Sequence, residues 1–193
     1  MRKLTVITHL TLDGVMQAPG RPDEDTRDGF GRGGWAQADN DQVMADFMGV
    51  GRGGDPVALL LGRRTYQDFY SFWPHQPDNP YTESLTKQQK YVASRTLAEP
   101  LPWQNSTLLP GDAADAVAAL KQEPGPGLVV LGSGELVQSL RPRALVDEYV
   151  LMIHPLILGR GRRLLPEGAP ADLRLAESVT TTTGVIIGRY QPR

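Results

Sequence analysis

The chain has 193 residues, a formal net charge of −2 and no cysteine. This length fits one domain with a substantial core, and the nearly balanced charge gives no positive field to attract nucleic acid or an anionic membrane. Without cysteine, disulfides and cysteine-ligated zinc are excluded, and three scattered histidines predict no metal site. No apolar run is long enough for a membrane span, and the N-terminal run is too interrupted for a signal peptide, so we expect a single cytoplasmic domain spanning 1–193.

Strands and helices alternate over most of the chain. A strand rich in β-branched residues is predicted at 3–10, and a long glycine-rich loop follows at 17–40. The further elements, in order, are a helix at 39–49 capped by Asp39 or Asn40, a strand at 57–61, helices at 64–72 and 81–88, strands at 90–94 and 106–109, a helix at 112–122, a strand running into a glycine turn at 127–134, a helix at 135–140, a strand at 147–155 and a hairpin within 173–191. This order predicts an α/β fold with helices on both faces of a mixed sheet.

A glycine turn follows the buried strand at 57–61. Gly62 leads into Arg63, Arg64 and Thr65, where free helix N–H groups, the helix dipole, two guanidinium groups and a hydroxyl suit a phosphate. A helix start with solvated arginines is the alternative that the same residues allow.

Two further turns follow predicted strands. Gly132–Leu136 lacks the third glycine of a GxGxxG motif, because Val137 stands at that position, so a simple tight turn is an alternative. Ser94 and Arg95 follow the strand at 90–94 and offer a hydroxyl and a guanidinium group for a ribose 2′-phosphate, which would favour NADPH over NADH. Because ligands bind beyond the carboxyl ends of strands in open α/β sheets, the three turns together suit a dinucleotide.

Five segments keep their order over nearly the whole chain. They are Leu12–Gly14, LLLGRRTY at 59–66, ASRTL at 93–97, LVVLGSGEL at 128–136 and VDEYVLMIHPLILGRGRRLL at 146–165. In these segments the chain resembles the dihydrofolate-reductase-like superfamily, and most closely the C-terminal reductase domain of bifunctional riboflavin-biosynthesis proteins. The resemblance implies a three-layer α/β/α fold with a mostly parallel central sheet. It also implies an NADPH-dependent reductase that transfers hydride to a C=O or C=N bond of a small pteridine-, pyrimidine- or sugar-derived substrate.

The resemblance also implies roles for individual residues. The turn after 57–61 would contact the cofactor's phosphates, the turn after 90–94 its 2′-phosphate, and the turn after 127–131 its pyrophosphate and nicotinamide ribose. With a loop that would close over the nicotinamide, the implied cofactor residues are Asp13, Gly14, Gly62, Arg63, Arg64, Thr65, Ser94, Arg95, Gly132, Ser133, Gly134, Glu135 and Leu136. For the substrate, Arg160 is expected to hold a phosphate, with a solvated basic turn as the alternative, and Trp35 to form a pocket wall or lid.

Hydride transfer leaves negative charge that a proton must neutralise, so the resemblance also implies an acid. Dihydrofolate reductases place it on a helix 16 residues before the glycine of the Gly-Arg turn, which is Asp46 here. Asp39 and Asp41 are the fallback, with a helix N-cap as their alternative role. The histidines are expected to be structural (His9 and His154, on strands) or exposed (His75).

The chain departs from the riboflavin-pathway reductases at the second glycine turn, where Gly132, Ser133 and Gly134 replace the usual Glu-Gly-Gly. It also lacks the deaminase half with its zinc ligands, so the resemblance does not fix the substrate. A non-catalytic module that binds a nucleotide or pterin is one alternative. Nucleic-acid binding through the GxGRGG segments at 29–34 and 49–54 is another, which the net charge opposes. A homodimer is expected from the resemblance and from the edge strand of the C-terminal hairpin.

Overall fold

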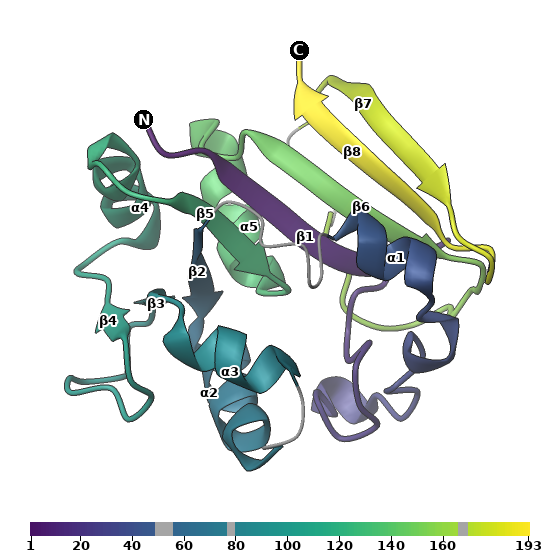
Figure 1. Ribbon diagram of the computed structural model, residues 1–193, viewed down its shortest axis with the longest axis horizontal. Coiled ribbons are helices and arrows are strands. Elements are labelled where there is room, and N and C mark those ends of the chain that lie inside the picture. Colours follow the sequence, from purple (N-terminus) through teal and green to yellow (C-terminus); the bar gives the residue numbers. More distant parts are fainter. Residues whose placement is uncertain (49–55, 77–79, 166–169) are drawn as a thin grey trace. The chain divides into compact units, whose positions relative to one another are not determined.

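The computed structural model describes residues 1–48, 56–76, 80–165 and 170–193 (Figure 1). The chain divides into two compact units, Met1–Thr5 with Asp55–Val146 and Val6–Gly54 with Asp147–Arg193. Strand β1 (Leu4–Thr11) begins in the first unit and continues in the second. Among the described helices, none has the length and apolar character that crossing a bilayer requires. That the whole chain acts as a single domain stays a prediction.

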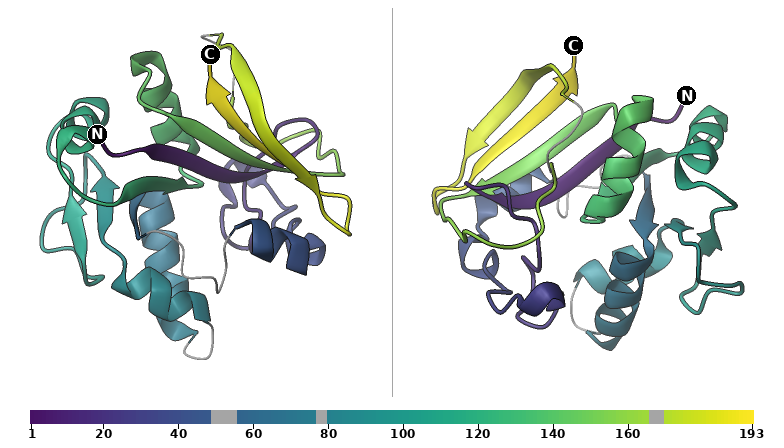
Figure 2. Two further views of the ribbon diagram at one scale, coloured as in Figure 1. Left: turned by 45° about the horizontal axis from the view of Figure 1, so that its top comes forward. Right: turned by 180° about the vertical axis from the view of Figure 1, so that it is seen from behind.

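The first unit contains a parallel sheet. Its strands lie in the order β4 (Ser106–Leu108), β3 (Lys90–Ala93), β2 (Val57–Gly62) and β5 (Gly127–Leu131), and then the first residues of β1. The pairs β4–β3, β3–β2 and β2–β5 are all parallel. Helices cover both faces, with α2 (Arg63–Phe72) and α3 (Pro80–Lys87) on one and α4 (Ala113–Gln122) and α5 (Gly134–Leu140) on the other (Figure 2). Short 3-10 turns follow at Trp73–His75 and Arg141–Arg143.

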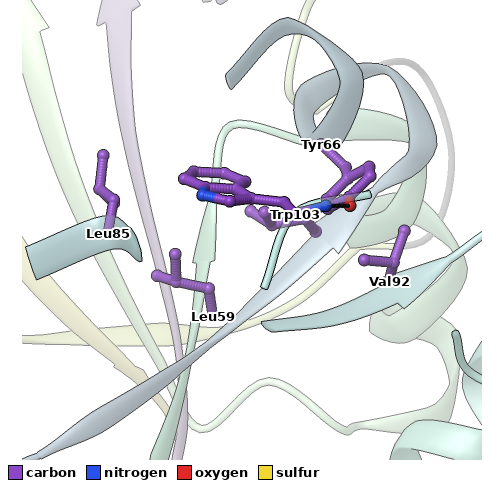
Figure 3. Close-up of a cluster of buried hydrophobic side chains, with 6 residues drawn as sticks. Leu59, Tyr66, Leu85, Val92 and Trp103 are labelled. Carbon is purple, nitrogen blue, oxygen red and sulfur yellow. Dashed lines mark hydrogen bonds between the residues drawn. The ribbon is translucent and has the colours of Figure 1, made fainter. Parts of the chain in front are cut away.

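The apolar run of β2 accounts for its central place in this sheet. Its four inner residues are buried, as expected of a strand covered on both faces. Leu59 and Leu61 lie two residues apart and therefore on one face, where they pack with Tyr66 of α2, Trp103 and the buried Val92 of β3 (Figure 3). The Tyr66 hydroxyl accepts the Trp103 backbone N–H at 3.0 Å, which fixes α2 to the loop after β3.

A buried lysine forms hydrogen bonds with backbone oxygens at the C-terminal end of α3. The Nζ atom of Lys90 donates to the backbone oxygens of Leu85, Thr86 and Gln88 at 2.7, 3.2 and 2.7 Å, and it lies 4.5 Å from the centre of the Trp103 ring. These acceptors satisfy the ammonium group and the last carbonyls of the helix together. Burial lowers the pKa of Lys90 to about 8.

The second unit contains antiparallel strands. From Val6 onward, β1 borders β6 (Glu148–His154), which pairs with β8 (Ile186–Pro192), and β8 pairs with the edge strand β7 (Leu173–Thr180). The β6–β8 and β8–β7 pairs are antiparallel, with a register shift in β7 between Leu175 and Glu177. Helix α1 (Gln42–Phe47) contributes Met44 to a core that includes Val150 and Ile187. Two 3-10 turns, Arg27–Gly29 and Gln37–Asp39, lie in the long loop.

The α/β class, the mostly parallel sheet and the C-terminal hairpin are confirmed. The start of α1 confirms one of the predicted caps and corrects the others. Its N-cap is Asp41, whose carboxylate accepts the Met44 N–H at 2.8 Å, whereas Asp39 and Asn40 do not cap it. Each of residues 39–41 has a side chain that can cap a helix. Asp39 does not do so because its carboxylate is hydrogen-bonded to His154. The GxGRGG segment at 49–54 lies outside the described residues.

Candidate functional site

The three predicted turns lie at one edge of the parallel sheet in the first unit. In the β2–β3 register Gly62 pairs with Ala93, and in the β2–β5 register Leu59 pairs with Val129. Because the three strands are parallel and aligned, the turns after them come to the same side. We call residues 62–65, 94–95 and 132–136 the carboxyl edge.

A chain of hydrogen bonds joins the two glycine turns of the carboxyl edge. The N–H of Gly62 donates to Oγ of Ser133 at 3.0 Å, and Oγ of Ser133 donates to Oγ1 of Thr65 at 2.9 Å. The one hydrogen of the Ser133 hydroxyl has a second acceptor in the backbone oxygen of Leu131, at 3.2 Å. When Ser133 donates to Thr65, the Thr65 hydroxyl hydrogen is available for an anion. Ser133 takes the left-handed conformation, with φ 53° and ψ 47°, which usually favours glycine. The hydroxyl that this serine adds compensates for that strained backbone by fixing the two turns to each other.

Helix α2 directs its N-terminus toward this edge. Its N-cap is Gly62, in extended conformation with φ −73° and ψ 159°, and no side chain caps it. The first N–H groups of a helix lack partners within the helix, and the helix dipole adds partial positive charge at this end. A ten-residue helix that starts at Arg63 therefore offers the donors that a phosphate group accepts.

Three guanidinium groups add positive charge to the carboxyl edge. Arg64 and Arg95 are exposed, and Arg63 is partly exposed with Nη1 3.3 Å from Oε1 of Gln67. Ser94 fixes the turn that carries Arg95, because its Oγ accepts the backbone N–H groups of Thr96 and Leu97 at 3.1 and 3.0 Å. The exposed carboxylate of Glu135, in the first turn of α5, is of opposite sign. The combination suits an anion that also carries hydroxyl groups, such as a ribose phosphate.

In the second unit, Asp13 and Arg160 hold the long loop to the segment after β6. The Asp13 carboxylate accepts the Thr11 hydroxyl at 2.6 Å and the N–H groups of Leu158 and Gly159 at 3.2 and 2.9 Å. The hydrogen bond from Thr11 lowers the pKa of Asp13. Nη2 of Arg160 donates to the backbone oxygens of Asp28 and Gly29 at 3.0 and 3.1 Å.

These contacts give Asp13 and Arg160 a structural task. The neighbouring Gly14 has a φ of +78°, as the tight turn after β1 requires. Nothing in these contacts tests the cofactor role of Asp13 and Gly14 or the substrate role of Arg160, which stay predictions.

Asp46 and Trp35 also lie in the second unit. Asp46 is in the last turn of α1, where its Oδ1 accepts a hydrogen bond from Nε2 of Gln42 at 3.0 Å. Trp35 donates its Nε1–H to the backbone oxygen of Gln17 at 2.8 Å and presents a ring edge to His154, with the ring centres 5.3 Å apart. That Asp46 supplies a proton to the substrate stays a prediction. Trp35 packs against His154, which pairs with a second histidine, His9.

Comparison with known proteins identifies the family of this chain. The family model for the RibD C-terminal domain matches residues 2–187. The chain belongs to the RibD C-terminal domain family. It is 29% identical over 172 residues to "Uncharacterized protein YyaP" of Bacillus subtilis (strain 168), covering 83% of this chain and 87% of that protein. It also shares its fold with a solved structure, "Putative riboflavin biosynthesis protein" from Shewanella sp. PV-4, with a TM-score of 0.68, 21% identity and 99% of each chain covered.

The second unit of this RibD C-terminal domain protein holds one group of residues whose arrangement the sequence did not reveal. Nε2 of the fully buried His154 lies 2.8 Å from Nδ1 of His9, and Nδ1 of His154 lies 2.7 Å from Oδ2 of Asp39. Asp39 therefore binds a histidine and does not cap α1. His9 and His154 are 145 residues apart, so no local motif joins them. The one sequence signal is that both lie on predicted strands. His75, in contrast, is exposed as predicted.

Proposed function

We propose that this protein is an NADPH-dependent reductase that binds its cofactor at the carboxyl edge of the first unit. The observation that carries the proposal is the meeting of three turns, from β2, β3 and β5, at one sheet edge with the N-terminus of α2. The substrate is a small molecule with a C=O or C=N bond, of the pteridine, pyrimidine or sugar-derived kind. Membership of the RibD C-terminal domain family supports both parts.

The residues of the carboxyl edge fit such a cofactor by their chemistry. The first N–H groups of α2 and the Thr65 hydroxyl are donors for the pyrophosphate, and Arg63 and Arg64 supply opposite charge. Arg95, on a turn fixed by Ser94, suits the 2′-phosphate that distinguishes NADPH from NADH. Bound there, NADPH would supply a hydride. The protein's part is to hold the cofactor in place and to deliver a proton.

The first experiment is a thermal-shift titration of the full chain with NADPH and NADH. A ligand that binds only the folded state stabilises it by RT ln(1 + [L]/Kd), about 2.7 kcal/mol at a hundredfold excess over Kd. We expect this stabilisation from NADPH, and a weaker one in the Arg63→Ala and Arg95→Ala variants. Arg143→Ala is the matched control, because Arg143 is in the same unit, is exposed and pairs with the exposed Asp115, and neither residue belongs to the carboxyl edge.

Two results would count against this function. If no nicotinamide nucleotide shifts the midpoint at millimolar concentration, the carboxyl edge is not a dinucleotide site. If NADPH binds but is never oxidised across pteridine and pyrimidine acceptors, a non-catalytic binding module becomes the better description.

We also propose that the protein is a homodimer that pairs through β7. This edge strand is exposed along most of its length, and the side chain of Leu175 is 54% exposed. An uncovered edge strand of this kind offers unpaired backbone groups to a second copy. Light scattering should give twice the chain mass, and a stable monomer would contradict the proposal. A Leu175→Lys variant should shift the equilibrium toward monomer.

A further inference from the structure

The histidine pair and Asp39 form a continuous chain of hydrogen bonds in the second unit. Asp39, 23% exposed, accepts from His154, and His154 is bonded in turn to His9 at the partly exposed end of the chain. The edge of the Trp35 ring covers His154. Within the described part of the protein, His9 Nε2 makes no hydrogen bond, although Nδ1 of the same ring does. The chain therefore has the fully buried His154 in its middle, a partly exposed carboxylate at one end and a partly exposed imidazole nitrogen at the other.

The geometry determines which nitrogens carry hydrogen. A carboxylate only accepts, so Nδ1 of His154 must be the donor to Asp39. In a neutral imidazole the second nitrogen is then an acceptor, so Nε2 of His154 accepts a hydrogen from Nδ1 of His9. This leaves the lone pair of His9 on Nε2, at the outer end. This bonding pattern thus places a base on the partly exposed His9 and connects it, through the buried His154, to the carboxylate of Asp39.

We propose that His9, His154 and Asp39 form a proton relay of an acid–base site for a small molecule, in which Nε2 of His9 takes up a proton and later donates it to an anionic oxygen or nitrogen of the ligand. Nε2 of His9 exchanges the proton, and His154 and Asp39 are positioning residues. The relay goes beyond the proposed reductase function and uses residues of the second unit only.

The proton passes through the relay without leaving a positive charge on His9. A proton binds Nε2 of His9, and the hydrogen on its Nδ1 crosses the 2.8 Å bond to Nε2 of His154. His154 becomes an imidazolium that pairs with the Asp39 carboxylate, and His9 stays neutral with its hydrogen on Nε2. When an anionic ligand atom takes the proton, the N–H bond of His9 Nε2 breaks, the anion is neutralised, and the hydrogen on His154 Nε2 returns to Nδ1 of His9. Solvent then reloads the outer nitrogen.

Electrostatics favour this route over a cationic His9. Burial, and then the charge of His154, lowers the pKa of His9 from 6.5 to about 4, and Asp39 partly opposes this. Within the described residues, the charges that act on His9 are those of His154 and Asp39. Trp35 and Thr183, whose hydroxyl donates to the backbone oxygen of Asp39 at 2.7 Å, are the uncharged neighbours. A proton that enters at His9 is therefore more stable on His154, beside the carboxylate.

Nitrogen-15 NMR of the histidines tests the relay directly in the full-length protein, without cofactor or substrate. At alkaline pH, His9 and His154 should both be neutral with hydrogen on Nδ1. On acidification, His9 should change to the Nε2–H form while staying neutral, and His154 should become doubly protonated, with one shared midpoint. The exposed His75, which belongs to the first unit, is an internal reference outside the relay.

Variants sharpen the test. Asp39→Asn keeps an acceptor for His154 but removes the charge, so the shared midpoint should fall by about one pH unit or more. Asp23→Asn, at an 84% exposed carboxylate in the same unit, is the matched control and should leave it in place. If His9 carries Nε2–H at alkaline pH, or becomes cationic while His154 stays neutral, the relay is wrong. If Asp39→Asn does not fold, the wild-type titration alone decides.

The test also separates the relay from the proposed function. If no nicotinamide nucleotide binds while the two histidines titrate together as described, the reductase assignment fails and the relay remains an acid–base site. If NADPH binds but His9 keeps hydrogen on Nδ1 at every pH, the reductase assignment stands and the relay is wrong.

Discussion

The two units of this protein build their chemical groups in different ways. In the first, parallel strands end in turns, and each turn carries residues that are adjacent in sequence, as at Gly62 and Arg63. In the second, antiparallel strands and a long loop bring together side chains that are far apart, as with Asp39 and His154, 115 residues from each other. In the first unit, parallel strands bring short local segments together into a candidate site. In the second unit, the candidate site consists of residues that are far apart in the sequence.

The largest expected effect is a loss of folding stability at acidic pH, which we attribute to His9 in the second unit. A histidine whose folded pKa lies below its unfolded value binds its proton more weakly when folded, so stability is intact above pH 6.5 and is lost as the pH falls toward 4. A shift from 6.5 to about 4 corresponds to about 3 kcal/mol. Urea denaturation across this range should therefore show a smaller acid loss in His9→Gln than in wild type.

His75→Gln is the matched control for that measurement. His75 is exposed and lies outside the group formed by His9, His154 and Asp39, so this variant should follow the wild-type curve if that group causes the acid loss. Equal acid losses in wild type and His9→Gln would mean that His9 is not enclosed as described.

The next effect tests how the long loop of the second unit is packed. A Cβ at Gly33 would lie 2.6 Å from the backbone oxygen of Arg21 and 2.7 Å from that of Pro22, whereas a Cβ at Gly31 would meet nothing within 4 Å. Gly33→Ala should therefore destabilise the protein by about 2 kcal/mol, the usual cost of overpacking. Gly31→Ala, in the same GxGRGG segment, should change stability little. Equal midpoints in urea would show that the loop is not packed this way.

A smaller effect concerns the third turn of the first unit. Arg95→Ala should weaken NADPH binding about tenfold, near 1.4 kcal/mol, because a charge-assisted hydrogen bond to the 2′-phosphate is lost. NADH lacks that phosphate, so its affinity should not change. Calorimetric titration of both nucleotides measures the difference, and an equal loss for both would place Arg95 elsewhere on the cofactor.

The smallest expected effect on stability is at Gly62. Its φ of −73° is open to any residue, and a Cβ would meet Ser133 at 3.6 Å, an ordinary contact. Gly62→Ala should therefore change the free energy of unfolding by less than about 0.5 kcal/mol. If the backbone must approach a phosphate closely there, the same variant should weaken NADPH binding several-fold. A variant that instead loses stability would show that the turn is more tightly packed than described.

The same contrast explains what the sequence could predict. The helices, the strands and the three turns follow from apolar runs and glycines that are close in the chain, so their places at the carboxyl edge were predictable once β2, β3 and β5 were taken as parallel. The roles of Asp13, Arg160 and Asp39 were not, because their partners lie 115 to 146 residues away. The choice of Asp41 over Asp39 as the cap of α1 was not predictable for the same reason, since Asp39 has a partner that no local pattern shows.

Amide NMR of the full chain titrated with NADPH tests the central claim most directly. The account predicts that the largest shifts lie at residues 62–65, 94–95 and 132–136, and that NADH reproduces those at 62–65 and 132–136 but leaves smaller shifts at 94–95. Shifts confined to other residues, or no shifts at millimolar NADPH, would contradict it.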